Sequence, residues 1–450
     1  MTKKILCYLR PATKEQFAYF VKCIDSSKII VHCSEHASVD KTGLPNLYYD
    51  FLKNNKLKIN KTTLSKSEAN DFIARCRLLR NIRKEVALKH LVAMFLAIDK
   101  MLDSEKPDFV IMQTVDSFIT DLLRFISVKR KIKFFGVCGT SWNNNFRVTI
   151  RGEKKINKKA DKNLTAQLLP RYIEETYIPD FVTKSIDNLK ISIYRRWMKS
   201  FIGSFYFFFK RYLSGDKYNF HYWHQQILCQ QNFSLLPMKD IGNSNWKKKL
   251  DDKKKPSLYL PLQMFPEATI DYWCENLEAI KYYETLEKVI KKLHNNFSLF
   301  VKEHPDVIGL RPKKFYSKII KDKRITIIPT YENSNHILRK TDAALVWTGT
   351  VGFDAIIRGK PAFAFGKPFY ASGKRFLKID LDIKIKKMMQ HISACKKNII
   401  TSAEQKRTFR YVTQQLYKGY YKNHIYWSKD NPKDIKDVKQ MGSSCKHLFK

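Results

Sequence analysis

Short apolar runs alternate with stretches of helical periodicity along most of the first half of the chain. Apolar residues recur at three- and four-residue spacing over about residues 65–103, which predicts helix, and a shorter helix is expected over 117–129. Four runs rich in β-branched and aromatic residues predict strands, at residues 3–9, 28–33, 108–113 and 133–138. This alternation is typical of a parallel sheet with crossover helices, so we predict a Rossmann-like domain.

The second half shows the same alternation more clearly. Helices are expected over about 272–293, 312–320 and 333–340, with another short helix after residue 347. Five apolar runs predict strands, at residues 256–263, 297–301, 325–329, 343–347 and 361–365. Five strands with four crossovers predict a second Rossmann-like domain.

A different pattern separates the two halves. The segment "IYRRWMKSFIGSFYFFFKRYLSG" places aromatic residues between basic ones, and its apolar core is too short to span a bilayer. An interfacial membrane helix has this composition, since aromatic rings settle at headgroup depth while Lys and Arg meet anionic lipid. The alternative is a helix buried between domains or in a dimer interface. The membrane hypothesis assigns contact to Arg195, Arg196, Trp197, Lys210 and Arg211.

Length and pattern together predict the domain organisation. A chain of 450 residues exceeds one ordinary core, so two domains of roughly 200 residues are expected. We predict an α/β fold class in which two Rossmann-like domains face each other across a cleft, with a helical aromatic and basic insertion between them. The expected parts are an N-terminal domain, a connecting region, a C-terminal domain and a helical tail, at 1–180, 181–250, 251–380 and 381–450.

The charge is the unusual part of the composition. The chain has 84 Lys and Arg against 42 Asp and Glu, a formal net charge of +42, which indicates an anionic partner. The basic residues are spread through ordered-looking sequence and form no tail, so we expect a membrane surface or anionic sugars and no nucleic acid. The nine cysteines are scattered without a C-x-x-C pair, as in a reduced cytoplasmic protein.

The N-terminal apolar run is too short for a signal peptide, and no stretch approaches the ~18 apolar residues of a spanning helix. We therefore predict a cytoplasmic protein that is peripheral on the inner membrane.

The first candidate site follows the predicted strand 297–301. Lys302, Glu303 and His304 come where that strand ends, and Pro305 turns the chain away. The carboxyl ends of parallel strands hold the ligands of open α/β sheets, and Lys and His donate to phosphate oxygens. A surface turn is the alternative for this stretch.

The second candidate site is "WTGTVGFDAIIRGKP". Its small residues precede a short helix, whose N–H groups and dipole favour a phosphate. An ordinary N-cap with a glycine turn is the alternative. Asp354 is expected to bond a sugar hydroxyl or to stabilise the first helical turn. The donor-binding residues predicted here are Thr348, Gly349, Thr350, Gly352, Asp354 and Lys360.

The third candidate site is "LPLQMFPEATI", just past the first strand of the second domain. Gln263 is expected to bind the donor, and Glu267 is expected to be a hydroxyl ligand, an acid or base, or a nucleophile. The alternative for Glu267 is a surface loop residue. The three candidate sites should meet at one edge of one sheet, which predicts a phosphate-binding cleft.

These three stretches also carry a resemblance. In order and spacing, "PLQMFPEATI", "VKEHPDVIGLRPKKFY" and "WTGTVGFDAIIRGKPAFAFGKPFY" resemble the bacterial capsule polysaccharide biosynthesis family, over about residues 255–375. That family includes Kdo transferases, which are GT-B glycosyltransferases that use CMP-Kdo. In such enzymes a histidine-proline pair contacts the donor phosphate, which implies that role and a catalytic one for His304. The family usually has glutamate where this chain has Asp354.

The expected function is therefore a glycosyltransferase of capsule or surface polysaccharide synthesis. The expected partners are a nucleotide sugar, a glycan or lipid-linked acceptor, the anionic inner-membrane surface and other polysaccharide-assembly proteins. No cofactor is expected beyond the co-substrate, which the resemblance implies is CMP-Kdo. No metal is expected, because the D-x-D pair at Asp380 and Asp382 lies beyond the donor motifs. The alternatives are a teichoic-acid-type polyol-phosphate transferase and a non-catalytic assembly protein of the same fold.

Overall fold

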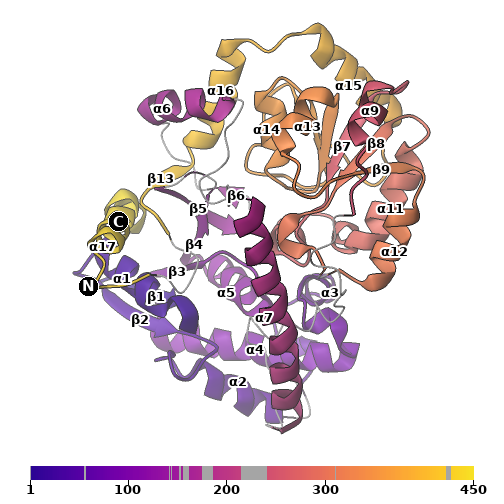
Figure 1. The fold of residues 1–450 in the computed structure, drawn as a ribbon. Helices are drawn as coiled ribbons and strands as arrows, with labels where there is room; N and C mark the ends of the chain where they lie inside the picture. The colour runs from indigo at the N-terminus through magenta and orange to yellow at the C-terminus, as the bar shows by residue number, and fades with distance from the viewer. Residues whose placement is uncertain are drawn as a thin grey trace.

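The computed structural model contains two α/β domains, each built on a largely parallel sheet (Figure 1). The predicted fold class is confirmed in this respect. The structure describes residues 2–54, 57–140, 142, 144–151, 154–155, 162–174, 186–213, 241–309, 311–421 and 427–450.

The first sheet contains the four predicted strands, whose ends differ from the prediction by one residue at most. They are β1 (Lys4–Tyr8), β2 (Ile29–Cys33), β3 (Phe109–Gln113) and β4 (Lys133–Gly139), which lie parallel in the order β4-β3-β1-β2. Three strands that the pattern did not predict extend this sheet antiparallel beyond β4: β5 (Asn145–Arg151), β6 (Lys154–Lys155) and β13 (Leu416–Lys418).

The helices of the first domain include two that the sequence pattern missed. They are α1 (Lys14–Ile24) and α2 (Leu44–Lys53), and the other helices are α3 (Lys66–Arg75), α4 (Lys84–Glu105) and α5 (Phe118–Lys129). The predicted helical region of 65–103 is thus divided in two. Ser65 and Glu68 form a capping box that begins α3, and an extended Cys76 ends it before the short 3-10 turn η3 (Leu79–Asn81).

The second sheet is wholly parallel. Its strands are β7 (Ser257–Pro261), β8 (Ser298–Lys302), β9 (Ile325–Ile328), β10 (Ala343–Val346), β11 (Ala362–Ala364) and β12 (Phe376–Lys378), in the order β12-β11-β10-β7-β8-β9. The five predicted strands are confirmed, and β12 was not predicted. The crossover helices are α11 (Tyr282–Leu293), α12 (Lys313–Lys321), α13 (Ser334–Lys340) and α14 (Val351–Ile357).

One helix prediction in this domain is partly wrong. The stretch predicted as a helix over 272–293 is three elements, α10 (Ala268–Asp271), η4 (Leu277–Ile280) and then α11. Asn276 caps η4 and separates it from α10, so the long helix begins only at Tyr282.

The domain boundaries are less simple than the predicted ones. Helix α6 (Lys162–Ile173) was assigned to the first domain, but its Tyr172 packs on Phe353 of α14. Conversely, the segment predicted as a tail contains α15 (Ile385–Lys397) and α16 (Ser402–Thr413), and then returns to the first domain through β13 and α17 (Pro432–Cys445), which packs against α1 (Figure 1). The chain therefore crosses between the domains more than once.

Helix α7 (Ile186–Leu213) is the described part of the predicted helical insertion. Trp197 was expected to contact a membrane, but its side chain is only 8% exposed and stacks on Phe201, so that expectation is wrong. The side chains of Arg196, Lys210 and Arg211 and the residues 214–240 lie outside the described part. Among the described helices, none is both long and apolar enough to cross a bilayer.

Candidate functional site

Three loops meet at the carboxyl edge of the second sheet. Strand β7 lies between β8 and β10 and is parallel to both, so the loops that follow these strands are neighbours. These loops contain Gln263 and Glu267, then Lys302 to His304, and then Thr348 to Gly352. The predicted convergence of the three stretches is confirmed.

The loops after β7 and β10 touch directly. A Cβ atom added to Gly349 would lie 2.7 Å from Nε2 of Gln263, so the absence of a side chain at Gly349 makes room for that amide. The Thr348 hydroxyl donates to the carbonyl of Thr269 over 3.2 Å. The backbone N–H of Gln263 donates to the hydroxyl of Tyr282 over 2.8 Å, which fixes the start of its loop.

The loop before α14 is held by Tyr370. The Tyr370 hydroxyl donates to the carbonyl of Gly349 over 2.6 Å, and a Cβ atom at Gly352 would collide with that hydroxyl. Thr350 is exposed at the N-cap position of α14. In the first turn of α14, the N–H groups of Gly352 and Phe353 donate to the carbonyls of Gly349 and Thr350 over 3.2 and 2.8 Å, so these two groups are engaged within the turn.

His304 begins the short turn η5 (Pro305–Val307). Its Nδ1 accepts the backbone N–H of Asp306 over 3.2 Å, so in the neutral ring the proton is on Nε2. Burial lowers the pKa of His304 to about 4, Asp306 opposes that shift, and nearby Lys302 adds to it. His304 is therefore a neutral imidazole at pH 7 that can donate Nε2–H to an anionic oxygen.

Glu303 does not fit its predicted role as a donor ligand. Its carboxylate accepts from Arg311 at 2.8 and 3.0 Å and from the hydroxyl of Tyr316 at 3.0 Å, and both partners of the Glu303–Arg311 ion pair are 0% exposed. Glu303 follows the last residue of β8, and its carboxylate is directed toward Arg311 and Tyr316. We correct its role to a structural one. Arg311 was missed, although it lies in the "GLRPKKFY" part of the quoted motif.

Glu267 lies in extended backbone immediately before α10. Its Oε2 accepts the hydroxyl of Thr269 over 2.5 Å. Burial raises the pKa of Glu267, while the Thr269 hydrogen bond and the positive charge of Arg77 act in the opposite direction. A carboxylate with a raised pKa is better suited to accept a proton near neutral pH than an ordinary one.

Two other predicted donor ligands are engaged elsewhere. Asp354 accepts the hydroxyl of Tyr172 from α6, so its carboxylate bonds a protein group where a sugar hydroxyl was expected. Lys360 precedes β11, and its amine donates to the carbonyl of Arg339, beside Asp342 at the start of β10. Lys360 is thus at the amino edge of the sheet, opposite the candidate site, and its prediction is wrong.

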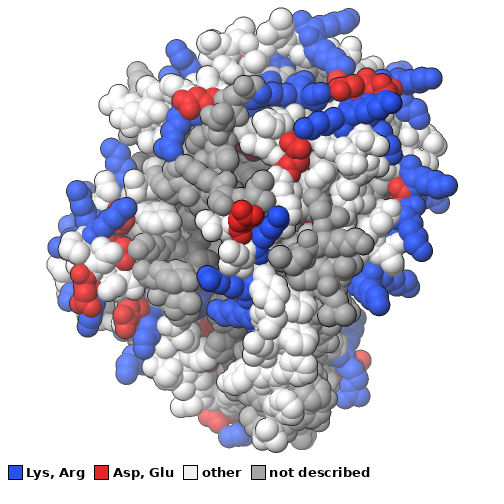
Figure 2. All heavy atoms as spheres, viewed as in Figure 1, with Lys and Arg blue, Asp and Glu red and all other residues white. Residues whose placement is uncertain are grey.

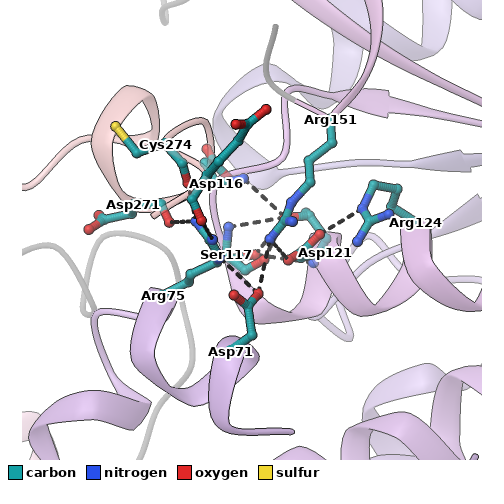
Figure 3. Close-up of polar contacts among 11 residues, drawn as sticks. Asp71, Arg75, Asp116, Ser117, Asp121, Arg124, Arg151, Asp271 and Cys274 are labelled. Carbon is teal, nitrogen blue, oxygen red and sulfur yellow. Dashed lines mark hydrogen bonds and ion pairs between the residues drawn. The ribbon is translucent and has the colours of Figure 1, made fainter. Parts of the chain in front are cut away.

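The first domain reaches this site through three arginines that sequence reasoning missed. Arg77 and Arg80 donate to the carboxylate of Asp271 over 2.6 and 2.7 Å. Arg75 points from α3 toward the chain around Asp271 and Cys274 and donates to both carbonyls, over 3.0 and 2.7 Å (Figure 3). The sequence signal for this cluster is the group of closely spaced arginines in "RCRLLRNIR". That signal does not identify the acidic partner, which lies in the other domain.

Within the described ranges, no group of three or more His, Cys, Asp or Glu side chains is placed to hold a metal ion. Asp380 and Asp382 are exposed beyond β12, and Asp382 pairs with Lys292 over 3.2 Å.

The fold and the site together define an α/β protein of two parallel-sheet domains with a candidate anion site on the second. Residues 209–374 match the family model described as capsule polysaccharide biosynthesis protein, which confirms the resemblance for this part of the chain. No curated protein sequence gives a significant match.

The comparison with solved structures gives matches at low sequence identity and low TM-score. UDP-GlcNAc 2-epimerase of Methanocaldococcus jannaschii is 15% identical, with 92% of this chain and 99% of that chain covered and a TM-score of 0.28. The beta Kdo 2,7 transferase KpsC of Thermosulfurimonas dismutans is 13% identical, with 92% and 90% covered and a TM-score of 0.36. The beta Kdo 2,4 transferase KpsC of Thermosulfurimonas dismutans is also 13% identical, with 75% of this chain and 88% of that chain covered and a TM-score of 0.33.

Proposed function

We propose that this protein is a glycosyltransferase of bacterial capsule or surface polysaccharide synthesis that uses a nucleotide sugar. The observation that carries the proposal is the meeting of His304, Gln263 and the Thr348–Gly352 loop at one edge of the second sheet. The family match over residues 209–374 supports the same function.

In this proposal the second domain binds the phosphate of the donor. His304 donates through Nε2–H, Lys302 supplies positive charge, and the Thr348–Gly352 loop completes the site. The acceptor hydroxyl attacks the anomeric carbon as the bond from that carbon to the phosphate oxygen breaks. The nucleotide leaves with the electron pair, and preorganised donors stabilise the charge that develops on it.

Glu267 is the proposed acceptor of the hydroxyl proton. Burial raises its pKa, which makes it a better proton acceptor than an ordinary carboxylate, and the positive charge of Arg77 favours the charged form. With these groups in place, transfer needs no metal ion.

The finer parts of the proposal concern the partners. We propose a CMP-linked donor such as CMP-Kdo, a glycan or lipid-linked acceptor, and an anionic membrane surface where the acceptor is met. The net charge of +42 supports anionic partners, and the family match supports a role beside other polysaccharide-assembly proteins.

Thermal-shift measurements with CMP, CDP, UDP and GDP, each with and without EDTA, test the proposal. We expect stabilisation by CMP that EDTA leaves unchanged and that His304→Asn abolishes. Stabilisation by UDP alone would contradict the CMP-linked donor, and a requirement for Mg²⁺ would contradict metal-free transfer. Polyol transfer from CDP-glycerol, or no nucleotide binding at all, would overturn the proposal that the protein is a glycosyltransferase.

A further inference from the structure

Helix α7 has two apolar faces, of which one is buried and the other is exposed. Ile193 is 3% exposed and Trp197 is 8% exposed, and they lie one turn apart on the inner face. A helix that packs on a domain through one face normally presents polar residues on the other. The opposite face of α7 departs from that rule.

The outer face contains a stripe of exposed apolar and aromatic side chains. Successive members are three or four residues apart, except for one step of eight residues and the adjacent pair Phe205 and Tyr206, so they lie along one broad side of the helix. Their exposed fractions run from 47% at Tyr194 to 82% at Leu213. We define the outer stripe as Ile191, Tyr194, Ile202, Phe205, Tyr206, Phe209 and Leu213.

Basic residues accompany the outer stripe. Arg195 and Lys199 are exposed on the same helix, and their long side chains can extend along apolar surface while the charge remains at the edge. Lysines and arginines also surround this face of the molecule in Figure 2. A basic helix with exposed aromatic residues is complementary to an anionic lipid surface and not to another basic surface. Because each chain has a net charge of +42, two copies repel each other, which disfavours a second copy of this chain as the partner of the outer stripe.

The position of α7 links the outer stripe to the candidate site. The helix contacts η5, the turn that His304 begins, and Lys190 near its start lies 5.7 Å from the ring centre of Tyr331. From there α7 runs down the face of the molecule toward the end that contains α2 (Figure 1). A surface that binds along α7 would therefore lie beside the donor loop of the second domain.

We propose that the outer stripe of α7 is a docking face for an anionic phospholipid bilayer. The helix lies in the plane of the interface, with Phe205 and Leu213 among the acyl chains and Arg195 and Lys199 at the headgroups. The biological role of this docking face rests on the proposed function, because a lipid-linked acceptor would then meet the site at the bilayer surface. Bilayer binding itself is independent of whether transfer occurs.

Co-sedimentation of the full chain with vesicles tests the proposal. Vesicles of phosphatidylcholine with phosphatidylglycerol are compared with pure phosphatidylcholine, using wild type and Ile202→Ser/Phe205→Ser/Leu213→Ser. The matched control is Ile29→Ser/Ile320→Ser/Ile399→Ser, whose positions are also exposed but lie outside α7. Circular dichroism establishes that all three proteins are folded, and light scattering gives their oligomeric state.

We expect the stripe variant to bind anionic vesicles at least tenfold more weakly than wild type, and the control variant to bind as wild type does. Binding should weaken in salt and on pure phosphatidylcholine. Equal binding by the stripe variant would overturn the proposal, as would a wild-type dimer that the stripe variant converts to monomer without any vesicle binding. Nucleotide-induced thermal shifts should be the same in all three proteins. A loss of vesicle binding with those shifts intact therefore separates this proposal from the proposed function.

Discussion

Arg77 of the first domain donates to the carboxylate of Asp271 in the second over 2.6 Å, and the two side chains are only 2% and 0% exposed. A buried ion pair that bridges two domains fixes their relative position, because neither charge can be left alone without a large desolvation cost. Asp271 ends α10, four residues after Glu267, so the pair also positions the proposed proton acceptor.

The first prediction concerns this pair. Arg77→Met leaves Asp271 buried with Arg80 as its remaining charged partner, and we expect the free energy of unfolding to fall by about 3 kcal/mol. Loss of the Arg77 charge should also raise the pKa of Glu267, which moves the acidic limb of the pH–rate profile upward. Urea denaturation and the pH dependence of transfer measure the two effects.

The matched control is an ion pair at the surface. Lys318 and Glu287 lie 2.5 Å apart, but their side chains are 58% and 47% exposed. Lys318→Met should therefore change stability by less than about 1 kcal/mol. If Arg77→Met proves equally mild, the domains are not held together by this pair.

The second prediction distinguishes Glu303 from its neighbour His304. Glu303→Gln leaves Arg311 as a buried charge without its carboxylate, and we expect a loss of about 3 kcal/mol in stability. Nucleotide affinity of the protein that remains folded should be close to that of wild type. A large loss of affinity with stability preserved would restore Glu303 as a donor ligand.

The third prediction is that His304→Asn reduces turnover about 100-fold or more with little change in melting temperature. Asn can accept the N–H of Asp306 as Nδ1 of His304 does, so η5 remains capped, while the donor to the phosphate is lost. A large drop in melting temperature with turnover intact would instead make His304 a structural residue.

The same variant has an expected pH signature. The pKa of His304 is lowered from 6.5 to about 4 by burial, with Lys302 and Arg311 acting in the same direction and Asp306 and Glu303 opposing them. On lowering the pH, His304 in the unfolded chain therefore takes up a proton near pH 6.5, whereas in the folded chain it does so only near pH 4. Stability is full above pH 6.5 and falls as the pH drops toward 4, so His304→Asn should lose less stability than wild type over that window. Identical pH profiles would place His304 outside a buried environment.

Much of the fold could be predicted because the strands are buried on both faces. A continuous apolar run such as that of β10 gives a local signal, and parallel order follows from the helices between strands. Strands β12 and β13 contain only three residues each, and each ends in an exposed lysine, so neither gives a continuous apolar run. The pairing of β13 with β5 joins residues far apart in the sequence, which no local pattern can indicate.

The site was predictable to the level of the sheet edge and no further. Lys302 and Glu303 are adjacent in the sequence, yet Glu303 forms a buried ion pair with Arg311 from the following loop. Asp354 is expected to be a ligand from its sequence position, but its carboxylate accepts the hydroxyl of Tyr172 from α6. The carboxylate of Asp271 pairs with Arg77, which follows α3, and with Arg80 of η3. Such long-range pairings decide which polar residues serve a ligand and which serve the fold.

The last prediction concerns the space that Gly352 leaves for Tyr370. The Tyr370 ring lies where a side chain at residue 352 would be, and its hydroxyl holds the carbonyl of Gly349 over 2.6 Å. Gly352→Ala should push the ring away and release that carbonyl. Tyr370→Phe should remove the hydrogen bond while keeping the packing, at a cost of about 1 kcal/mol in stability. Both changes should weaken nucleotide binding, measured by calorimetry, and Gly352→Ala should weaken it more, because it displaces the backbone that is expected to face the phosphate. Ala371→Ser, next to the ring but outside this contact, serves as the control. If the nucleotide affinity of Gly352→Ala equals that of the control, the Thr348–Gly352 loop does not bind the donor.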